Sequence, residues 1–121
     1  MGRLIHYIVD ADRDIDTIFE YILQNYYSES IARSTVQKII GGIKKLSKIP
    51  ELGVSLDKKL GRKLNPEVEI RMLILDQYLV FYFVDKDKGE VFVMRVLHAK
   101  QDYMRFLHSF QALSAQQSET I

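Results

Sequence analysis

The sequence contains no cysteine and no tryptophan, and only two prolines in 121 residues. Without cysteine there can be no disulfide scaffold, thiolate zinc site, iron–sulfur cluster or cysteine nucleophile. The longest apolar run, Tyr78–Val84, is far shorter than the roughly 20 residues that a membrane-spanning helix needs. The N-terminus also lacks the apolar core and small-residue cleavage site of a secretory signal. We therefore expect a cytoplasmic protein with no membrane attachment.

The composition that remains is that of an ordinary globular domain. Hydrophobic residues make up 47% of the chain and charged residues 27%, which excludes disorder of the whole chain. A length of 121 residues fits one domain with its own core. We expect that single domain over residues 1–113 and a disordered tail over residues 114–121, which have nothing to bury.

The net charge is only +1, but the basic residues are concentrated in the middle of the chain. Residues 38–71 carry nine basic and four acidic side chains, whereas residues 1–37 carry three basic and six acidic ones. Such a segment attracts phosphate groups or an acidic protein surface, although a solvated helix face and loop would have the same pattern. With one arginine from a later segment, the candidate binding residues are Lys44, Lys45, Lys48, Lys58, Lys59, Arg62, Lys63 and Arg95.

The N-terminal third predicts a strand followed by a helix. Leu4–Val9 is short, apolar and rich in β-branched and aromatic residues, which favours a strand. From Ile15 to Tyr26, apolar residues recur at helical spacing, so we expect an amphipathic helix. Asp10 or Asp12 is the expected N-cap of this helix.

A second helix is expected from its N-cap at Ser28 to about Lys48. Gly41 and Gly42 lie inside it, which indicates either close packing or a bend. Pro50 then ends the helix, and the short connection between the two helices predicts a helical hairpin. Its apolar stripe consists of Ala32, Val36, Ile39, Ile43 and Leu46.

The second half of the chain predicts a three-stranded meander. A polar loop over Val54–Pro66 precedes strand-like runs at Val68–Leu75, Tyr78–Val84 and Glu90–Leu97. Their short connections favour antiparallel pairing, and the doubly apolar middle run is expected at the centre of the sheet, beneath the hairpin. With a short helix over Lys100–Phe110, the fold class is α+β, in the order β-α-α-β-β-β, with a helical hairpin on a small, mainly antiparallel sheet.

No motif in the sequence supports metal or cofactor chemistry. The three histidines lack the i, i+4 spacing of a helical zinc site, and no carboxylate cluster accompanies them. Glycine-rich phosphate loops and the Gly-x-Ser-x-Gly elbow of serine hydrolases are also absent. We therefore expect no bound metal and no cofactor.

The candidates for chemistry are polar residues that we expect to gather at one end of the sheet: Arg71, Arg95, His98, Lys100 and Tyr103. Metal-free cleavage of RNA needs a proton acceptor, a cation for the phosphate and an acid for the leaving oxygen. These residue types could supply all three. Each also has an ordinary structural explanation: a histidine bonded to backbone at a strand end, arginines in surface ion pairs, and a tyrosine in the core.

Four segments, in this order and at these intervals, resemble the RelE/ParE superfamily of toxins from bacterial type II toxin–antitoxin modules. They are Asp16–Ile22, Leu46–Gly53, Tyr78–Val84 and Val93–Asp102, and the resemblance covers residues 4–107. It implies a growth-inhibiting, plasmid-stabilisation type of toxin, neutralised by a cognate antitoxin whose extended or helical segment wraps the domain. Operator DNA would then be bound only through the antitoxin.

The resemblance implies two alternative activities. RelE-like members enter the ribosomal A site and cut mRNA without a metal, whereas ParE-like members poison DNA gyrase and are not nucleases. Arg71 matches by position a basic residue of the RNases, and His98, Lys100 and Tyr103 fall where their C-terminal catalytic residues lie. In an endoribonuclease, Arg71 would contact phosphate, His98 or Lys100 would transfer protons, and Tyr103 would orient or stack on a base.

Two departures from the family pattern favour the ParE-like activity. Leu79 stands where family members commonly have arginine, and Ala99-Lys100 stands where two basic residues are usual. One lost donor to a transition-state charge is often worth about 3 kcal/mol. We therefore prefer inhibition of gyrase through the hairpin, including Tyr26, Tyr27 and its lysines, and the C-terminal segment. The alternatives are a ribosome-dependent mRNA endoribonuclease and a non-toxic remnant that only binds its antitoxin.

Overall fold

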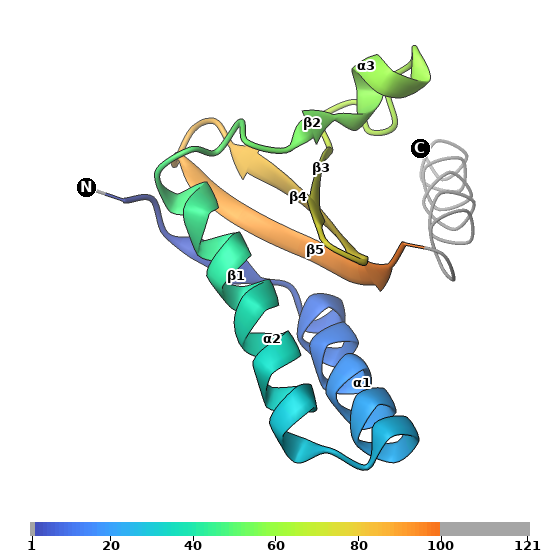
Figure 1. The fold of residues 1–121 in the computed structure, drawn as a ribbon. Helices are drawn as coiled ribbons and strands as arrows, with labels where there is room; N and C mark the ends of the chain where they lie inside the picture. Colours follow the sequence, from blue (N-terminus) through green and yellow to red (C-terminus); the bar gives the residue numbers. More distant parts are fainter. Residues whose placement is uncertain (1, 100–121) are drawn as a thin grey trace.

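The computed structural model describes residues 2–99, whose two long helices lie on one side of a five-stranded sheet (Figure 1). The helix expected over residues 100–110, the expected tail, and the candidates Lys100 and Tyr103 lie outside the described residues. Within residues 2–99, no helix is both long and apolar enough to cross a membrane.

The first strand and the first helix are separated by a single residue. Strand β1 (Ile5–Tyr7) is followed by Ile8, which is the N-cap of helix α1 (Val9–Tyr26) and makes no side-chain cap hydrogen bond. The prediction that Asp10 or Asp12 caps the helix is wrong, because both lie within its first turn, where they face the positive end of the helix dipole. The earlier start places Ala11, which is fully buried, in the core.

The second helix begins and packs as predicted. In α2 (Glu29–Lys44), the Ser28 hydroxyl accepts a hydrogen bond from the Ile31 N–H, and a single 3₁₀ turn (Lys45–Ser47) follows the helix. At Gly42 an added Cβ would lie 2.5 Å from Cδ2 of Leu75, whereas at Gly41 it would meet nothing. The close-packing explanation therefore holds for Gly42.

The sheet has the strand order β1-β5-β4-β3-β2, with β1 parallel to β5 and every other pair antiparallel. Its remaining strands are β2 (Val54–Ser55), β3 (Arg71–Leu75), β4 (Tyr78–Asp85) and β5 (Glu90–His98). The prediction that the Tyr78–Val84 run is central is confirmed, since β4 is the third of the five strands.

The segment predicted as a polar loop contains two short elements. Strand β2 leads directly into α3 (Leu56–Leu60), which the Ser55 hydroxyl caps and Gly61, at φ 72°, ends. Helix α3 is only five residues long, so helical periodicity could not reveal it. The strand predicted over Val68–Leu75 also begins later than expected, at Arg71.

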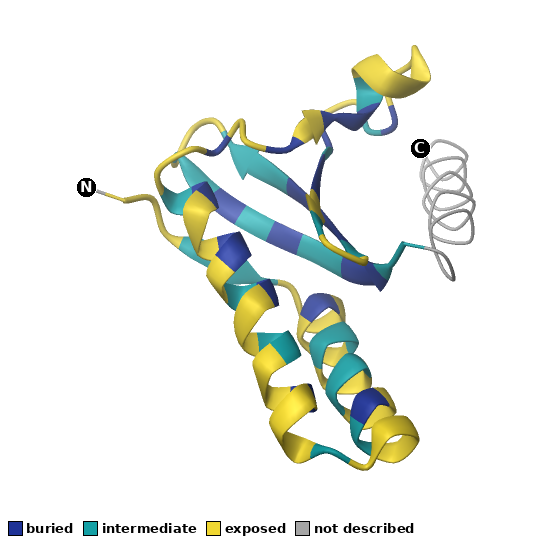
Figure 2. Ribbon diagram, in the orientation of Figure 1, coloured by how far each residue is buried: buried dark blue, intermediate teal, exposed yellow. Residues whose placement is uncertain are grey.

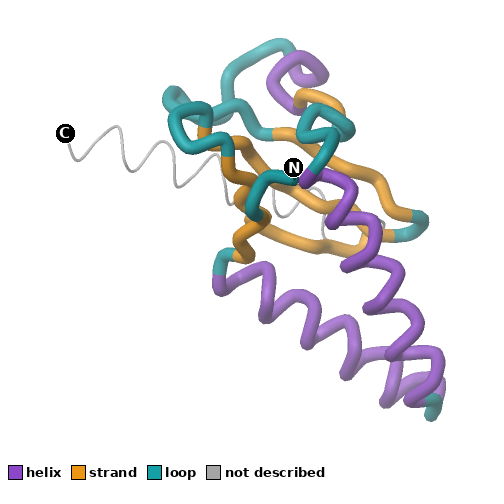
Figure 3. The backbone as a smooth tube through the Cα atoms, turned by 90° about the vertical axis from the view of Figure 1, so that its left-hand side faces the viewer, coloured by secondary structure: helices purple, strands orange, loops and turns teal. Residues whose placement is uncertain are grey.

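The sheet lies between the helical hairpin and α3 (Figure 3), and it separates two clusters of buried side chains. Val80 and Tyr82 of β4 face the helical hairpin, whereas Leu79 and Phe81 face α3 and the loop that follows it. The alternation along β4 explains why its sequence is apolar on both faces. The hairpin lies on one face of the sheet and α3 on the other.

Candidate functional site

Arg95 lies beside a β-bulge in β5 and is bonded to helix α1. Phe81 of β4 pairs with Arg95, but the next residue, Tyr82, pairs with Val93, so β5 has one extra residue at this point. Arg95 donates from Nε and Nη2 to the Asp14 carboxylate at 2.7 and 3.0 Å. The Val96 N–H donates to the same carboxylate at 2.9 Å. These charge-assisted hydrogen bonds fix α1 against β5 and engage an arginine predicted to bind a partner.

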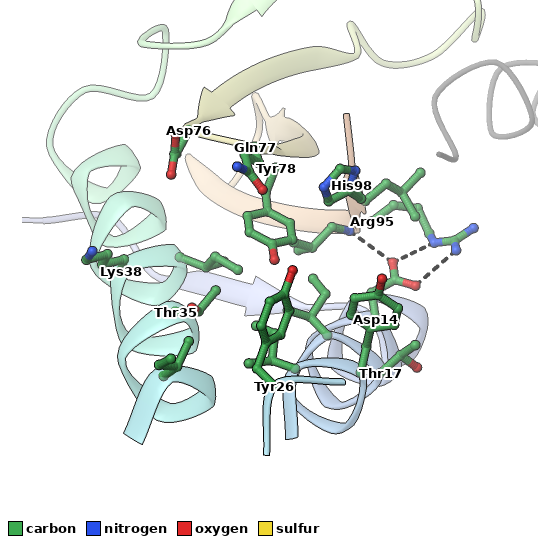
Figure 4. A pocket seen from close by; sticks show the side chains of 17 residues that line it. Asp14, Thr17, Tyr26, Thr35, Lys38, Asp76, Gln77, Tyr78, Arg95 and His98 are labelled. Carbon is green, nitrogen blue, oxygen red and sulfur yellow. Dashed lines mark hydrogen bonds and ion pairs between the residues drawn. The ribbon is translucent and has the colours of Figure 1, made fainter. Parts of the chain in front are cut away.

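A cleft of about 680 Å³ opens beside this ion pair, between the hairpin and the end of the sheet (Figure 4). Three parts of the chain line it: the two long helices, the β3–β4 turn at Asp76 and Gln77, and the end of β5. The tips of α1 and α2 project beyond the sheet and leave this side of the hairpin uncovered (Figure 1). Its polar lining includes Lys38 from α2 and His98 from β5.

Aromatic side chains dominate the mouth of the cleft. Tyr78 and His98 pair across β4 and β5, and their rings meet edge to face with centroids 5.6 Å apart. Burial raises the pKa of Tyr78 above its ordinary value of 10.0, and nearby Tyr26, Asp76 and Tyr21 add to that rise. Tyr26 and Tyr78 point toward each other across the opening (Figure 4).

The cleft is suited to binding a partner segment. Much of the projecting half of the hairpin is exposed (Figure 2). Tyr21, Tyr26 and Ile31 are 51%, 62% and 51% exposed there, so it offers apolar surface next to hydroxyl groups. A mainly apolar concavity with a few convergent polar groups is typical of a binding site. No group of histidine, aspartate and glutamate side chains that could hold a metal ion occurs in residues 2–99.

Arg71 and His98 do not come together. Arg71 of β3 pairs with Tyr82 of β4, and His98 of β5 pairs with Tyr78 of β4. Their positions along β4 are therefore four residues apart, and the two residues lie on the strands that flank β4 on either side. Four residues correspond to about 13 Å along the strands. The two residues are also two strand spacings apart across the sheet. The expectation that they gather at one end of the sheet is wrong because β3 and β5 run in the same direction. The start of β3 and the end of β5 therefore lie at opposite ends of the sheet.

Arg71 is largely enclosed at its own end of the sheet. Its side chain is 16% exposed and donates from Nη1 to Glu69 at 3.1 Å. Its buried Nε has no hydrogen-bond partner among the described residues.

The basic middle of the sequence is divided between the two sides of the sheet. Lys44, Lys45 and Lys48 are exposed at the end of α2 on the hairpin side. Helix α3 belongs to the opposite side because Leu56 is buried in the second cluster. The four basic residues that α3 and the following loop expose are Lys58, Lys59, Arg62 and Lys63.

Sequence reasoning missed the cleft itself. Asp14 is one of several acidic residues near the start of a predicted helix. Nothing in the sequence indicates that it binds Arg95 of a distant strand. Lys38, Asp76 and Gln77 carry no motif and meet only through the fold. The exposed tyrosines near the hairpin turn were the one available signal.

The fold and site together define a small α+β protein with a cleft between a helical hairpin and the end of its sheet. A family model for the ParE toxin of the type II toxin–antitoxin system parDE matches residues 5–103. Because that match covers most of the chain, the protein belongs to the ParE toxin family. The predicted membership of the RelE/ParE superfamily and the toxin role in a type II module are confirmed.

Solved structures share the fold at low sequence identity. The chromosomal ParDE toxin–antitoxin system from P. aeruginosa is 19% identical, with a TM-score of 0.64, over 82% of this chain and 98% of that one. The toxin–antitoxin complex RelBE2 from Mycobacterium tuberculosis is also 19% identical, with a TM-score of 0.50, over 81% of this chain and 99% of that one. A search of curated protein sequences found no match.

Proposed function

We propose that this toxin inhibits DNA gyrase in the cytoplasm through protein contacts, in the ParE-like manner. The observation that carries the proposal is the separation of Arg71 from His98. A proton-transfer group must lie within hydrogen-bond reach of its substrate, at about 3 Å. The backbones of Arg71 and His98 are about 13 Å apart along the strands, and this separation argues against a role for both side chains at one scissile phosphate.

The other cations expected of a nuclease are also missing or engaged. Arg95 is bonded to Asp14 through two nitrogens. Leu79, at the position where relatives commonly have arginine, is buried in the cluster on the α3 side. Among the described residues, Lys38 remains as a cation in the cleft with His98, which is less positive charge than the full set would offer a phosphorane-like transition state.

A supercoiling assay with purified gyrase tests the proposal. We expect the toxin to block supercoiling of relaxed plasmid at stoichiometric excess, while mRNA in a parallel translation extract stays intact. Undisturbed supercoiling at high toxin excess would contradict the proposal. Cut mRNA, with loss of cutting in a His98→Ala variant, would favour the endoribonuclease, and normal growth after induction without antitoxin would favour the non-toxic remnant.

We also propose that the cognate antitoxin neutralises the toxin by seating an apolar segment in the cleft. The exposed tyrosines and Ile31 on the hairpin support this, since they offer apolar surface that a partner would cover. The structural neighbours come from toxin–antitoxin systems, which supports an antitoxin partner. Operator DNA would be reached only through that antitoxin.

A further inference from the structure

A buried tyrosine holds the loop between α2 and β2 against the sheet. Tyr82 is fully buried, and its hydroxyl donates to the Pro50 carbonyl at 2.6 Å and accepts from the Gly53 N–H at 2.9 Å. At Gly53 an added Cβ would lie 2.8 Å from the backbone oxygen of Met72, so only glycine allows the loop this close to the sheet. The loop is therefore fixed in one position.

The same loop presents apolar side chains to solvent. Ile49, Leu52 and Val54 are 53%, 42% and 50% exposed, whereas Pro50 and Gly53 are buried. Apolar side chains grouped on an exposed loop mark an interaction site. Because the loop is already ordered, a partner would lose little conformational entropy on binding it.

Unpaired lysines surround this loop. Lys44, Lys45 and Lys48 are exposed, and none of the three forms an ion pair with any residue in the range 2–99. Glu51 is the single acidic residue within Ile49–Val54. Arg71, which is paired with Glu69, lies beside Tyr82 and opposes the rise in the pKa of Tyr82 that burial causes.

We propose that these six side chains, which we call the loop platform, dock the protein target of the toxin: Ile49, Leu52, Val54, Lys44, Lys45 and Lys48. The complementary surface would be a protein patch with carboxylates around an apolar centre. The three apolar side chains favour protein over nucleic acid, because contacts with a phosphate backbone would leave them unburied. The inference rests on the proposed function, in which the target is a protein.

The loop platform is separate from the cleft. The cleft is lined by α2 from Ile31 to Ile39, whereas the platform begins at Lys44. The two surfaces share no residue, and their nearest members on α2, Ile39 and Lys44, are about 8 Å apart along the helix axis. Changes to the platform are therefore expected to affect target binding and leave antitoxin binding intact.

Two double variants of the full chain test the platform. Lys45→Glu with Lys48→Glu removes its charge, and Ile49→Ser with Leu52→Ser removes its apolar centre. We expect each to raise the toxin concentration for half-inhibition of gyrase supercoiling at least tenfold and to abolish growth arrest in the host. Antitoxin affinity and the melting temperature should stay close to the wild-type values.

The matched control is Lys86→Glu with Lys88→Glu, which makes the same charge change on the exposed β4–β5 turn. It should shift half-inhibition less than threefold. Folded platform variants that inhibit gyrase and arrest growth as the wild type does would overturn the inference and leave the proposed function standing. Full potency of the Ile49→Ser, Leu52→Ser variant, with loss in the lysine variant alone, would overturn it in favour of phosphate recognition.

A failure of the proposed function would give a different experimental result from a failure of the loop platform. If the wild type arrests growth without inhibiting gyrase, the proposed target is wrong, and growth arrest by the platform variants then decides the inference. Arrest that persists in both variants overturns it, and arrest lost in both, with antitoxin binding retained, supports a different protein target.

Discussion

Tyr82 shows how much one polar atom can determine. Along β4 its side chain belongs to the apolar series that faces the hairpin, and its ring is fully buried there. Its hydroxyl nevertheless satisfies two backbone groups of the loop before β2. Buried polar groups are tolerated when they are hydrogen-bonded, so the tyrosine adds specificity to an otherwise apolar core.

Tyr82→Phe is expected to lower the free energy of unfolding by about 1–3 kcal/mol, because the Gly53 N–H and the Pro50 carbonyl lose their partner. Urea denaturation measures the loss. Tyr27→Phe is the control, since Tyr27 is 91% exposed and should change stability by less than about 0.5 kcal/mol.

The same variant carries a pH signature. Burial raises the pKa of Tyr82 above 10.0, so the unfolded chain releases this proton at lower pH than the folded one. The contribution of protonated Tyr82 to the free energy of unfolding is complete below pH 10. It is lost as the pH rises through the pKa of Tyr82 in the folded protein. In Tyr82→Phe the decline of stability above about pH 10 should be shallower, although Tyr7 and Tyr78, whose pKa values are also raised, keep part of it. Equal slopes for the two proteins would contradict this.

The helices and strands owe their placement to contacts between elements as much as to local sequence. Helix α1 begins at Val9 without a side-chain cap because Ala11 is buried in the core. The carboxylate of Asp14 then fastens the helix to the bulged part of β5. Helix α2, in contrast, has a local cap at Ser28 and was predicted from its sequence.

The adjacent glycines of α2 provide a matched pair for testing helix packing. Gly41→Ala should raise the free energy of unfolding by up to about 1 kcal/mol, because the site is open and alanine favours the helix. Gly42→Ala should give no such gain, since its Cβ would press on Leu75 at 2.5 Å. Denaturant unfolding of both variants checks the difference, and equal gains would show that α2 does not pack closely at Gly42.

At the scale of the whole molecule, the hairpin separates two surfaces. Its projecting end forms the cleft with the β3–β4 turn and β5, and its other end leads into the loop platform. If the antitoxin occupies the cleft, neutralisation and target binding depend on different side chains. A toxin with this division could lose either property without losing the fold.

We expect Tyr26→Ala with Ile31→Ser to weaken antitoxin binding at least tenfold, because both side chains are exposed and line the cleft. Titration calorimetry or co-purification with the cognate antitoxin measures the change. Tyr27→Ala is the control, as Tyr27 is more exposed but is not among the cleft-lining residues. Unchanged affinity in the double variant would place the antitoxin elsewhere.

The sequence by itself determined the order of the elements, the hairpin, the central position of β4 and the family. Those features follow from short-range patterns: helical spacing in α1 and α2, turn lengths between strands, and a run that is apolar on both faces. Short elements such as α3 escaped prediction because five residues contain too little periodicity.

Only the tertiary structure decided which side chains meet. Arg71 and His98 lie apart because two antiparallel steps return the chain to its original direction. Arg95 meets Asp14, which is 81 residues away in sequence, through contacts between β5 and α1. The cleft likewise joins residues that are distant in sequence. The loop platform is one continuous segment, but its position against the sheet depends on Tyr82 of β4. Side-chain proximity between elements depends on strand register and bulges, and these are set by packing across the whole core.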